Sequence, residues 1–137
     1  MGNYATFLEY ILGLVKAILV RTSSTVPSHV QRIHKNKIKG VPASLTEKLI
    51  ELIIAHKPVK KIVVYGSRAT SDYRKTSDID IAIVDENWTS SDISLVHFNL
   101  EEELSIPLKI DLVNFYNVSK QSMKDAINKG ITLYESK

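Results

Sequence analysis

The residues best suited to chemistry in this 137-residue chain are aspartates set into apolar stretches. Asp78 and Asp80 open the run DIDIAIV, and Asp111 lies within the later stretch LKIDLVNF. Side chains alternate across a strand, so Asp78 and Asp80 are expected on one face, about 6–7 Å apart. Unpaired carboxylates so placed repel each other and are costly to bury. We therefore expect a hard divalent cation such as Mg²⁺, which prefers oxygen ligands, between them.

A third carboxylate would extend this site. If the strand with Asp111 pairs beside the strand with Asp80, three carboxylates can hold two Mg²⁺ ions, as in phosphoryl and nucleotidyl transfer. Asp111 could then also take the proton from the hydroxyl group that receives the transferred nucleotidyl group. Lys109 shares its face and is a candidate for charge balance or phosphate contact, or else a snorkelling lysine at a strand entrance. The simpler alternative for Asp-x-Asp is a strand end with Asp78 solvated and Asp80 paired to Lys or Arg.

Gly66 and Ser67 follow a β-branched run and mark a turn that can approach a ligand. A glycine directly after a buried strand lets the backbone turn sharply. If residues 67–72 begin a helix, their free amides and the Ser67 hydroxyl would form an anion site. An ordinary strand-to-helix turn capped by Ser67 is the alternative.

The elements that must position these residues follow from hydrophobic periodicity and end signals. Ser44 and Glu47 have capping-box spacing, and Gly130 is expected to end the last helix in a left-handed conformation. The expected order is a helix from Ser44 to His56, a strand at Ile62–Tyr65, a strand at Asp78–Val84, a helix at Ser91–Leu104 capped by Ser90 or Ser91, a strand at Leu108–Phe115, a helix at Ser119–Lys129 capped by Ser119, and a short edge strand at Ile131–Tyr134. This order predicts an α/β domain with one layer of helices on a small sheet.

Composition narrows the class of protein. The chain has no cysteine, which excludes disulfides, thiolate zinc sites and cysteine nucleophiles and fits a cytoplasmic location. The net charge is +3, but residues 1–43 hold six Lys or Arg against one Glu, about +5, which leaves about −2 for residues 44–137. The basicity therefore belongs to the N-terminal arm, and no direct nucleic-acid partner is expected.

The chain divides into two parts: residues 1–43, an N-terminal amphipathic helix and basic linker, and residues 44–137, the domain with the aspartates. Phe7–Val20 is apolar but short and is interrupted by Glu9 and Lys16. A spanning helix needs roughly 17–25 apolar residues, and a signal peptide carries positive charge before its apolar run. We expect no integral membrane segment. We expect this helix to pack on the domain or on a partner, or to contact a membrane surface peripherally.

One pattern in the chain resembles the Gly-Ser-x10-Asp-x-Asp motif of the minimal nucleotidyltransferases (MNT family, DNA polymerase β superfamily). It consists of Gly66-Ser67, ten further residues, and then Asp78-Ile79-Asp80. The stretch KIDLVNF with Asp111 resembles that family's third-carboxylate strand. The resemblance covers about Ser44 to Glu135 and not residues 1–43. It implies a polymerase β-like nucleotidyltransferase fold, with a small mixed sheet and helices packed mainly on one face.

The resemblance also implies roles for single residues. Asp78 and Asp80 would bind both Mg²⁺ ions and Asp111 the catalytic one, so these three carboxylates would be the catalytic residues. The nucleotide phosphates of ATP would be held by four residues: Gly66, Ser67, Arg68 and Lys75. Thr70-Ser71 departs from the family pattern, in which many members have a basic residue and Gly.

Many proteins of this family are antitoxins that transfer AMP from ATP to a tyrosine of a HEPN-domain ribonuclease toxin. The resemblance therefore implies a nucleotidyltransferase of the protein adenylyltransferase type, with a HEPN toxin as partner and acceptor, in an oligomer with that partner. Two alternatives remain. One is a non-catalytic antitoxin that neutralises its partner by covering it. The other is transfer to a small molecule such as an aminoglycoside, which usually needs an added acceptor-binding domain that residues up to Lys137 do not supply.

Overall fold

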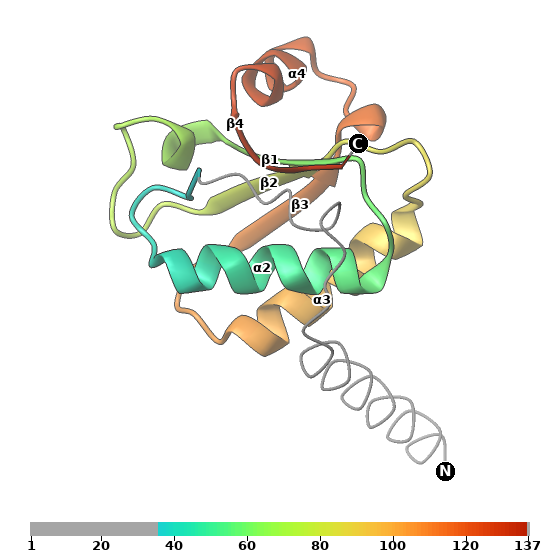
Figure 1. The fold of residues 1–137 in the computed structure, drawn as a ribbon. Helices are drawn as coiled ribbons and strands as arrows, with labels where there is room; N and C mark the ends of the chain where they lie inside the picture. The colour runs from blue at the N-terminus through green and yellow to red at the C-terminus, as the bar shows by residue number, and fades with distance from the viewer. Residues whose placement is uncertain (1–35, 137) are drawn as a thin grey trace, which may run out of the picture. The chain divides into compact units, whose positions relative to one another are not determined.

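The sheet that carries the aspartates has the strand order β3-β2-β1-β4 in a computed structural model, which describes residues 36–136. Its elements are α2 (Ala43–His56), β1 (Lys61–Tyr65), the 3₁₀ turn η2 (Gly66–Ala69), β2 (Ile79–Ile83), α3 (Ser90–Leu104), β3 (Ile110–Asn114), the 3₁₀ turn η3 (Phe115–Asn117), α4 (Gln121–Asn128) and β4 (Ile131–Glu135) (Figure 1). The expected alternation of helices and strands is confirmed. The helix predicted at Phe7–Val20 lies outside the described residues.

The sheet is mixed, because its strands run in both directions. β1 pairs antiparallel with β2 on one side and with β4 on the other, whereas β2 and β3 are parallel. β1 and β2 are short β-branched runs, KIVVY and IDIAI, of the kind that favours a pleated, buried surface. The connection from β2 to the parallel strand β3 passes through α3, as a parallel pair requires a crossover.

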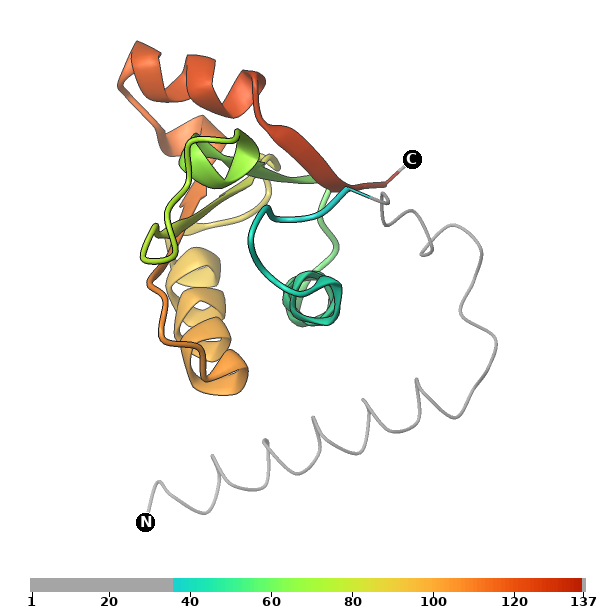
Figure 2. The ribbon, with the colours of Figure 1, turned by 90° about the vertical axis from the view of Figure 1, so that its left-hand side faces the viewer.

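Helices cover the two faces of the sheet unequally (Figure 1), which confirms a mixed sheet with helices mainly on one face. The expectation of a single layer of helices was wrong, because α4 packs on the other face through Ile127 (Figure 1). Figures 1 and 2 show α2 and α3 together on one face and α4 on the other. The larger hydrophobic core joins β2 through Ile79, Ile81 and Ile83 to α2 and α3. Alternate strand residues point to opposite faces. Asp80 and Ala82 therefore belong to the α4 face, where Ala82 packs in a smaller cluster with Ile127.

The predicted helix starts were wrong in detail. α2 begins after Pro42 with no side-chain cap, so Ser44 does not form a capping box. α3 is capped one residue earlier than expected, by Thr89, which exchanges hydrogen bonds with Asp92. α4 begins at Gln121 after Lys120, with no side-chain cap from Ser119.

The prediction for Gly130 was also wrong, because positive φ angles among the described glycines occur at Gly40 and Gly66. Gly130 is instead required by a close approach. A Cβ atom there would lie 2.5 Å from the Val64 carbonyl oxygen.

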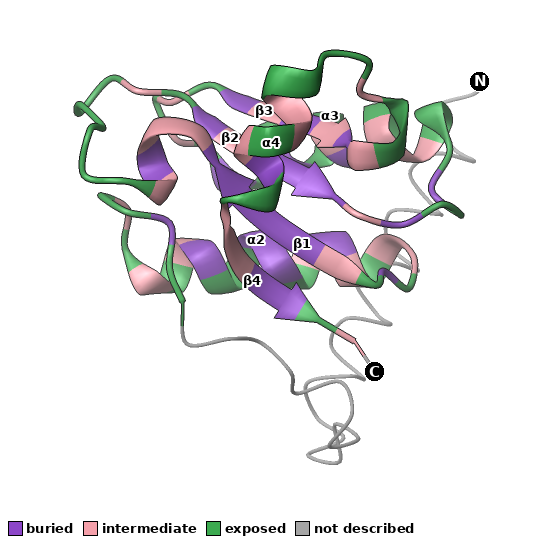
Figure 3. Cartoon of the chain, turned by 90° about the horizontal axis from the view of Figure 1, so that it is seen from above, coloured by how far each residue is buried: buried purple, intermediate pink, exposed green. Residues whose placement is uncertain are grey.

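The described part of the predicted linker packs on the domain. Ile38 is only 1% exposed and belongs to the larger core, and its amide donates to Thr46 Oγ1 at 3.4 Å. Asn36 Nδ2 donates to the Thr132 carbonyl at 3.1 Å. The burial colours of Figure 3 show buried residues along the central strands and exposed ones on the outer side of α4. In residues 36–136, no helix is long and apolar enough to cross a membrane.

Candidate functional site

Asp80 and Asp111 lie side by side at the start of the parallel strand pair. The register of β2 and β3 places Asp80 opposite Asp111, with Ile79 opposite Ile110. Alternation turns both carboxylates away from the core under α2 and α3, since Ile79, Ile81 and Ile110 fill that core. The expectation that the strand of Asp111 pairs beside that of Asp80 is confirmed.

The electrostatics of this pair are unfavourable without a cation. Partial burial, the charges of Asp111 and Asp78 and a hydrogen bond with Asp111 together raise the pKa of the Asp80 carboxyl, which Lys109 lowers in part. Burial, with the charges of Asp80 and Asp111, raises the pKa of the neighbouring Tyr65 hydroxyl to about 12. Negative charge is therefore concentrated here, and a bound cation would relieve it.

Lys109 supplies positive charge at the rim. Its Nζ lies 3.6 Å from Asp111 Oδ1, and the two side chains are 65% and 40% exposed. At this exposure the ion pair is weak and readily exchanged. Lys109 can thus balance the charge of Asp111 and give way when another cation or a phosphate arrives.

Gly66 lies directly against Asp80. It has φ +74°, and a Cβ atom there would lie 2.6 Å from Asp80 Oδ2. Only glycine adopts this conformation without strain and leaves this space. The sharp turn predicted from Gly66 is present, and it brings the main chain next to a carboxylate.

Ser67 lies in a shorter helical turn than expected. Residues 66–69 form η2, and Thr70 then leaves it in an extended conformation, with its amide donating to the Ser67 carbonyl at 3.1 Å. The α-helix considered for residues 67–72 does not form. Any phosphate contact of Ser67 would therefore come from its hydroxyl and from this turn.

Asp78 lies just before β2 and is exposed. Its charge reaches Asp80, as the pKa of Asp80 shows. Within residues 36–136, however, no three His, Asp or Glu side chains already gather around a common point. A cation shared by all three carboxylates therefore requires them to come closer together than they stand in this structure.

Arg68 has a position that its sequence-based assignment as a phosphate contact did not anticipate. Its side chain is 1% exposed, and its guanidinium nitrogens donate to main-chain carbonyl oxygens. The donors that a phosphate would need are thus used inside the protein. Three of these carbonyls belong to the loop that follows Arg68, at Arg74, Lys75 and Ser77, and the fourth belongs to Lys39, 29 residues earlier. The residue type alone does not show that a loop will fold around this arginine.

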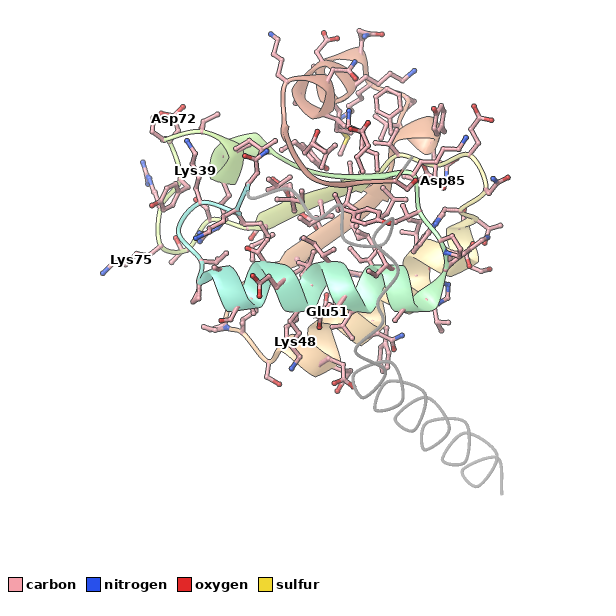
Figure 4. All side chains as sticks on the ribbon, viewed as in Figure 1. Lys39, Lys48, Glu51, Asp72, Lys75 and Asp85 are labelled. Atoms are coloured by element: carbon pink, nitrogen blue, oxygen red, sulfur yellow. The ribbon has the colours of Figure 1, made fainter. Side chains whose placement is uncertain are left out.

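Lys75 is exposed in the loop between η2 and β2. Figure 4 shows it at the edge of this loop, in the region where Lys39 and Asp72 are also labelled. The structure thus brings Gly66, Asp80 and Asp111 together at the start of β2. Ser67 follows Gly66 in the same turn, Asp78 lies just before the strand, Lys75 is exposed in the loop, and Arg68 is buried.

The donor set fits a hard divalent cation. Asp78, Asp80 and Asp111 offer only carboxylate oxygens, which Mg²⁺ prefers, and their mutual repulsion favours occupation. Asp80 and Asp111 would be the central ligands, with Asp78 at the open side. When bound, such an ion neutralises phosphate charge and lowers the pKa of an attacking hydroxyl.

Comparison with protein families gives one match, over residues 47–137, to the family described as polymerase beta, nucleotidyltransferase. This range contains every residue of the candidate site. A search of curated proteins gives no match.

Solved structures share the fold. A chain of a toxin-antitoxin crystallised with AMP-PNP has a TM-score of 0.56 and 22% identity, over 67% of this chain and 74% of that one. A chain of the tri-AMPylated Shewanella oneidensis HEPN toxin in complex with MNT antitoxin has a TM-score of 0.53 and 21% identity, over 68% and 71%. A chain described as a minimal nucleotidyltransferase has a TM-score of 0.50 and 21% identity, over 64% and 87%.

Proposed function

Since the chain belongs to the polymerase β nucleotidyltransferase family, we propose that it is a Mg²⁺-dependent enzyme that moves AMP from ATP to a hydroxyl of a partner protein. The observation that carries this proposal is the pairing of Asp80 with Asp111 across β2 and β3, directly beside Gly66. Asp78, Asp80 and Asp111 are the proposed ligands of two Mg²⁺ ions.

The proposed reaction forms one bond and breaks one. The acceptor oxygen bonds to the α-phosphorus of ATP, and the bond from that phosphorus to the bridging oxygen breaks, which releases pyrophosphate. Asp111 is the proposed base for the acceptor's proton, because it is 40% exposed and so open to an incoming hydroxyl. Gly66 and Ser67 are the proposed phosphate contacts, and Lys75 an outer one.

The proposed partner is a HEPN-domain toxin, and the proposed acceptor is one of its tyrosines. Support comes from the fold shared with chains of toxin-antitoxin complexes, one with AMP-PNP and one with a tri-AMPylated HEPN toxin. The site itself is consistent with a large acceptor, because Asp78 and Lys109 lie on an open surface. Neutralising such a toxin would make this protein an antitoxin.

The proposal is tested with α-labelled ATP, Mg²⁺ and the product of the neighbouring gene. We expect wild-type protein to label that product and the variant Asp78→Asn/Asp80→Asn to leave it unlabelled. Chelation of Mg²⁺ should abolish transfer in the same way. Absence of labelling by wild type, or equal labelling by the double variant, would contradict the enzymatic function.

A second candidate is a binding module that neutralises its partner by covering it, with the site idle. It is favoured by one observation, that no three acidic or imidazole side chains of the described residues already form a metal site. The two candidates separate in cells. Variants of the carboxylates should lose protection against the toxin if catalysis neutralises it, and keep protection if binding does.

A further inference from the structure

We propose that Arg68 is a positioning residue: its guanidinium group holds the turn that leads into Asp78 and so sets where this carboxylate stands beside Asp80. The inference rests on the proposed function, because it concerns carboxylates assigned to that site. Arg68 acts here through the main chain and contacts neither nucleotide nor metal.

The guanidinium group binds three carbonyls of one turn. Arg68 Nε donates to the Ser77 carbonyl at 2.9 Å, and Nη2 donates to the carbonyls of Arg74 and Lys75, each at 3.2 Å. The turn is also closed internally, by the Ser77 amide on the Arg74 carbonyl at 3.0 Å and by the Arg74 amide on Ser77 Oγ at 2.7 Å. The planar guanidinium group of Arg68 thus holds the carbonyls of this turn in a fixed arrangement.

A fourth bond ties the same side chain to the segment before α2. Arg68 Nη1 donates to the Lys39 carbonyl at 2.9 Å, and the Lys39 amide donates back to the Arg68 carbonyl at 3.1 Å. Gly40 has φ +81°, and a Cβ atom there would lie 2.7 Å from Nη1. The Tyr73 ring packs over the guanidinium carbon at 5.3 Å. The loop that follows η2 and the segment before α2 therefore enclose Arg68 together.

Burial makes these bonds necessary to the loop. Arg68 is the charged side chain with the lowest exposure among those described, 1%. A buried guanidinium is tolerated only when its donors are satisfied. The partners that the structure shows are carbonyl oxygens of Lys39, Arg74, Lys75 and Ser77. If the guanidinium is removed, these carbonyls lose their hydrogen-bond donors. The turn is then expected to open, so that water can bind the carbonyls instead.

Asp78 is consequently fixed from both sides. The carbonyl of Ser77, which precedes it, accepts from Arg68, and the amide of Ile79, which follows it, donates to the Lys109 carbonyl at 2.9 Å. Arg68 also lies in η2, directly after Gly66 and Ser67. One side chain therefore links the proposed phosphate turn to Asp78, the proposed metal ligand that lies outside the strands.

The test compares the full-length wild type with Arg68→Met and Arg68→Lys by amide hydrogen exchange and by Mn²⁺ binding followed by electron paramagnetic resonance. Arg68→Met keeps an unbranched, flexible side chain at this position and removes the guanidinium group with all of its donors. We expect amides of residues 74–78 to exchange about tenfold faster or more, while those of β1 and β4 keep their rates. The Mn²⁺ dissociation constant should rise by about tenfold.

The control is Arg74→Met, which removes a charge from the same loop. Its side chain is exposed, whereas its main chain forms the turn, so exchange at residues 74–78 should stay at the wild-type rate. Arg68→Lys keeps the charge but cannot span four carbonyls, so its exchange should fall between wild type and Arg68→Met. If Arg68→Met does not fold, Arg68→Lys decides the question by the same two measurements.

Wild-type exchange at residues 74–78 in a folded Arg68 variant would overturn the proposal. Faster exchange with unchanged Mn²⁺ affinity would also overturn it, because the loop would then be held without positioning Asp78. If the wild type binds no Mn²⁺, the proposed metal site fails, and the Mn²⁺ half of the inference fails with it. The exchange rates then still decide whether Arg68 holds the turn.

Discussion

Two residues determine the character of the candidate site: Asp80, whose charge is unfavourable, and Gly66, which makes room for it. Partial burial and two neighbouring carboxylates raise the pKa of Asp80. A group that is destabilising in the apo protein and needed by a cation is typical of a functional position. Removing the charge of Asp80 should therefore raise the stability of the apo protein and lower its activity.

Asp80→Asn should raise the stability of the apo protein at neutral pH and abolish transfer. Because the folded pKa of Asp80 lies above its unfolded value, the ionised carboxylate costs stability once the pH exceeds the folded pKa. The variant removes this cost, so its advantage should disappear at about pH 3, where wild-type Asp80 is protonated. Urea unfolding at both pH values checks this. A variant less stable than wild type at neutral pH would contradict it.

Gly66→Ala should lower stability by about 1–3 kcal/mol, because φ +74° is strained for alanine. The added methyl group would also press on Asp80 Oδ2. We expect weaker Mn²⁺ binding in addition to a lower melting temperature. Thermal unfolding and Mn²⁺ titration measure the two effects separately. Wild-type Mn²⁺ affinity in this variant would show that Gly66 does not shape the carboxylate pair.

From the sequence, the pairing of the Asp80 and Asp111 strands is a condition for a shared site, and the register of β2 and β3 meets that condition. The sequence did not anticipate that Arg68 would be buried with its donors on main-chain carbonyls, since residue type does not reveal which carbonyls will come within reach. The predicted roles as metal ligands, catalytic residues or phosphate contacts stay predictions for all seven residues: Gly66, Ser67, Arg68, Lys75, Asp78, Asp80 and Asp111.

Among the elements, the end of α2 and the start of α3 are joined through Asp92. Its carboxylate accepts from Thr89 at the helix cap, pairs with Lys57 Nζ at 2.9 Å and contacts His56 Nε2 at 2.9 Å. The His56 ring also packs against buried Trp88 at 5.4 Å. One carboxylate therefore caps α3 and anchors it to α2.

Asp92→Asn should cost about 1–3 kcal/mol at neutral pH, because charge-assisted hydrogen bonds and a helix cap are lost together. The bonds from His56, Thr89 and Lys57 hold the pKa of Asp92 well below its usual range. A lowered folded pKa gives stability that is present above the unfolded pKa, about 3.9, and is lost as the pH falls below it.

The difference between wild type and Asp92→Asn should therefore shrink when urea unfolding is repeated below about pH 3. Asp125→Asn is the control. Asp125 accepts from Gln121 Nε2 on the exposed side of α4, so its replacement should change stability by less than about 0.5 kcal/mol. A difference for Asp92→Asn that stays constant with pH would contradict the assigned role.

Element types were predictable because periodicity reports which face is buried, whereas helix ends depend on competition between nearby groups. Ser44 was expected as a cap, but Pro42 already starts the helix. Thr89, one residue before the expected serines, caps α3 because the Asp92 side chain accepts a hydrogen bond from the Thr89 amide in return. The close approach of Gly130 to β1 depends on tertiary packing and has no local signal.

For the whole molecule, the segment before α2 connects the core to the candidate site. Ile38 is buried among the residues of the larger core. The main chain of the adjacent Lys39 accepts a hydrogen bond from the Arg68 guanidinium group and donates one to the Arg68 carbonyl. The domain thus draws on residues that charge and composition assign to a linker. Composition alone did not indicate this packing, because one apolar residue, Ile38, among several lysines anchors the segment in the core.

Ile38→Ala should lower stability by about 2–4 kcal/mol, as expected for a fully buried isoleucine. Its neighbour Lys37 is exposed, so Lys37→Ala serves as control and should stay within about 0.5 kcal/mol of wild type. Chemical denaturation of the full chain gives both values. Equal stability of Ile38→Ala and wild type would mean that this segment does not belong to the domain.

The central claim, that the site transfers a nucleoside monophosphate to a protein hydroxyl, is tested most directly by the position of the label. ATP labelled at the α- or the γ-phosphate is incubated with Mg²⁺, this protein and its partner. We expect the α label to become attached to the partner and the γ label to leave as pyrophosphate, and we expect neither result with Asp80→Asn/Asp111→Asn. Attachment of the γ label, or attachment of the α label by the double variant, would contradict it.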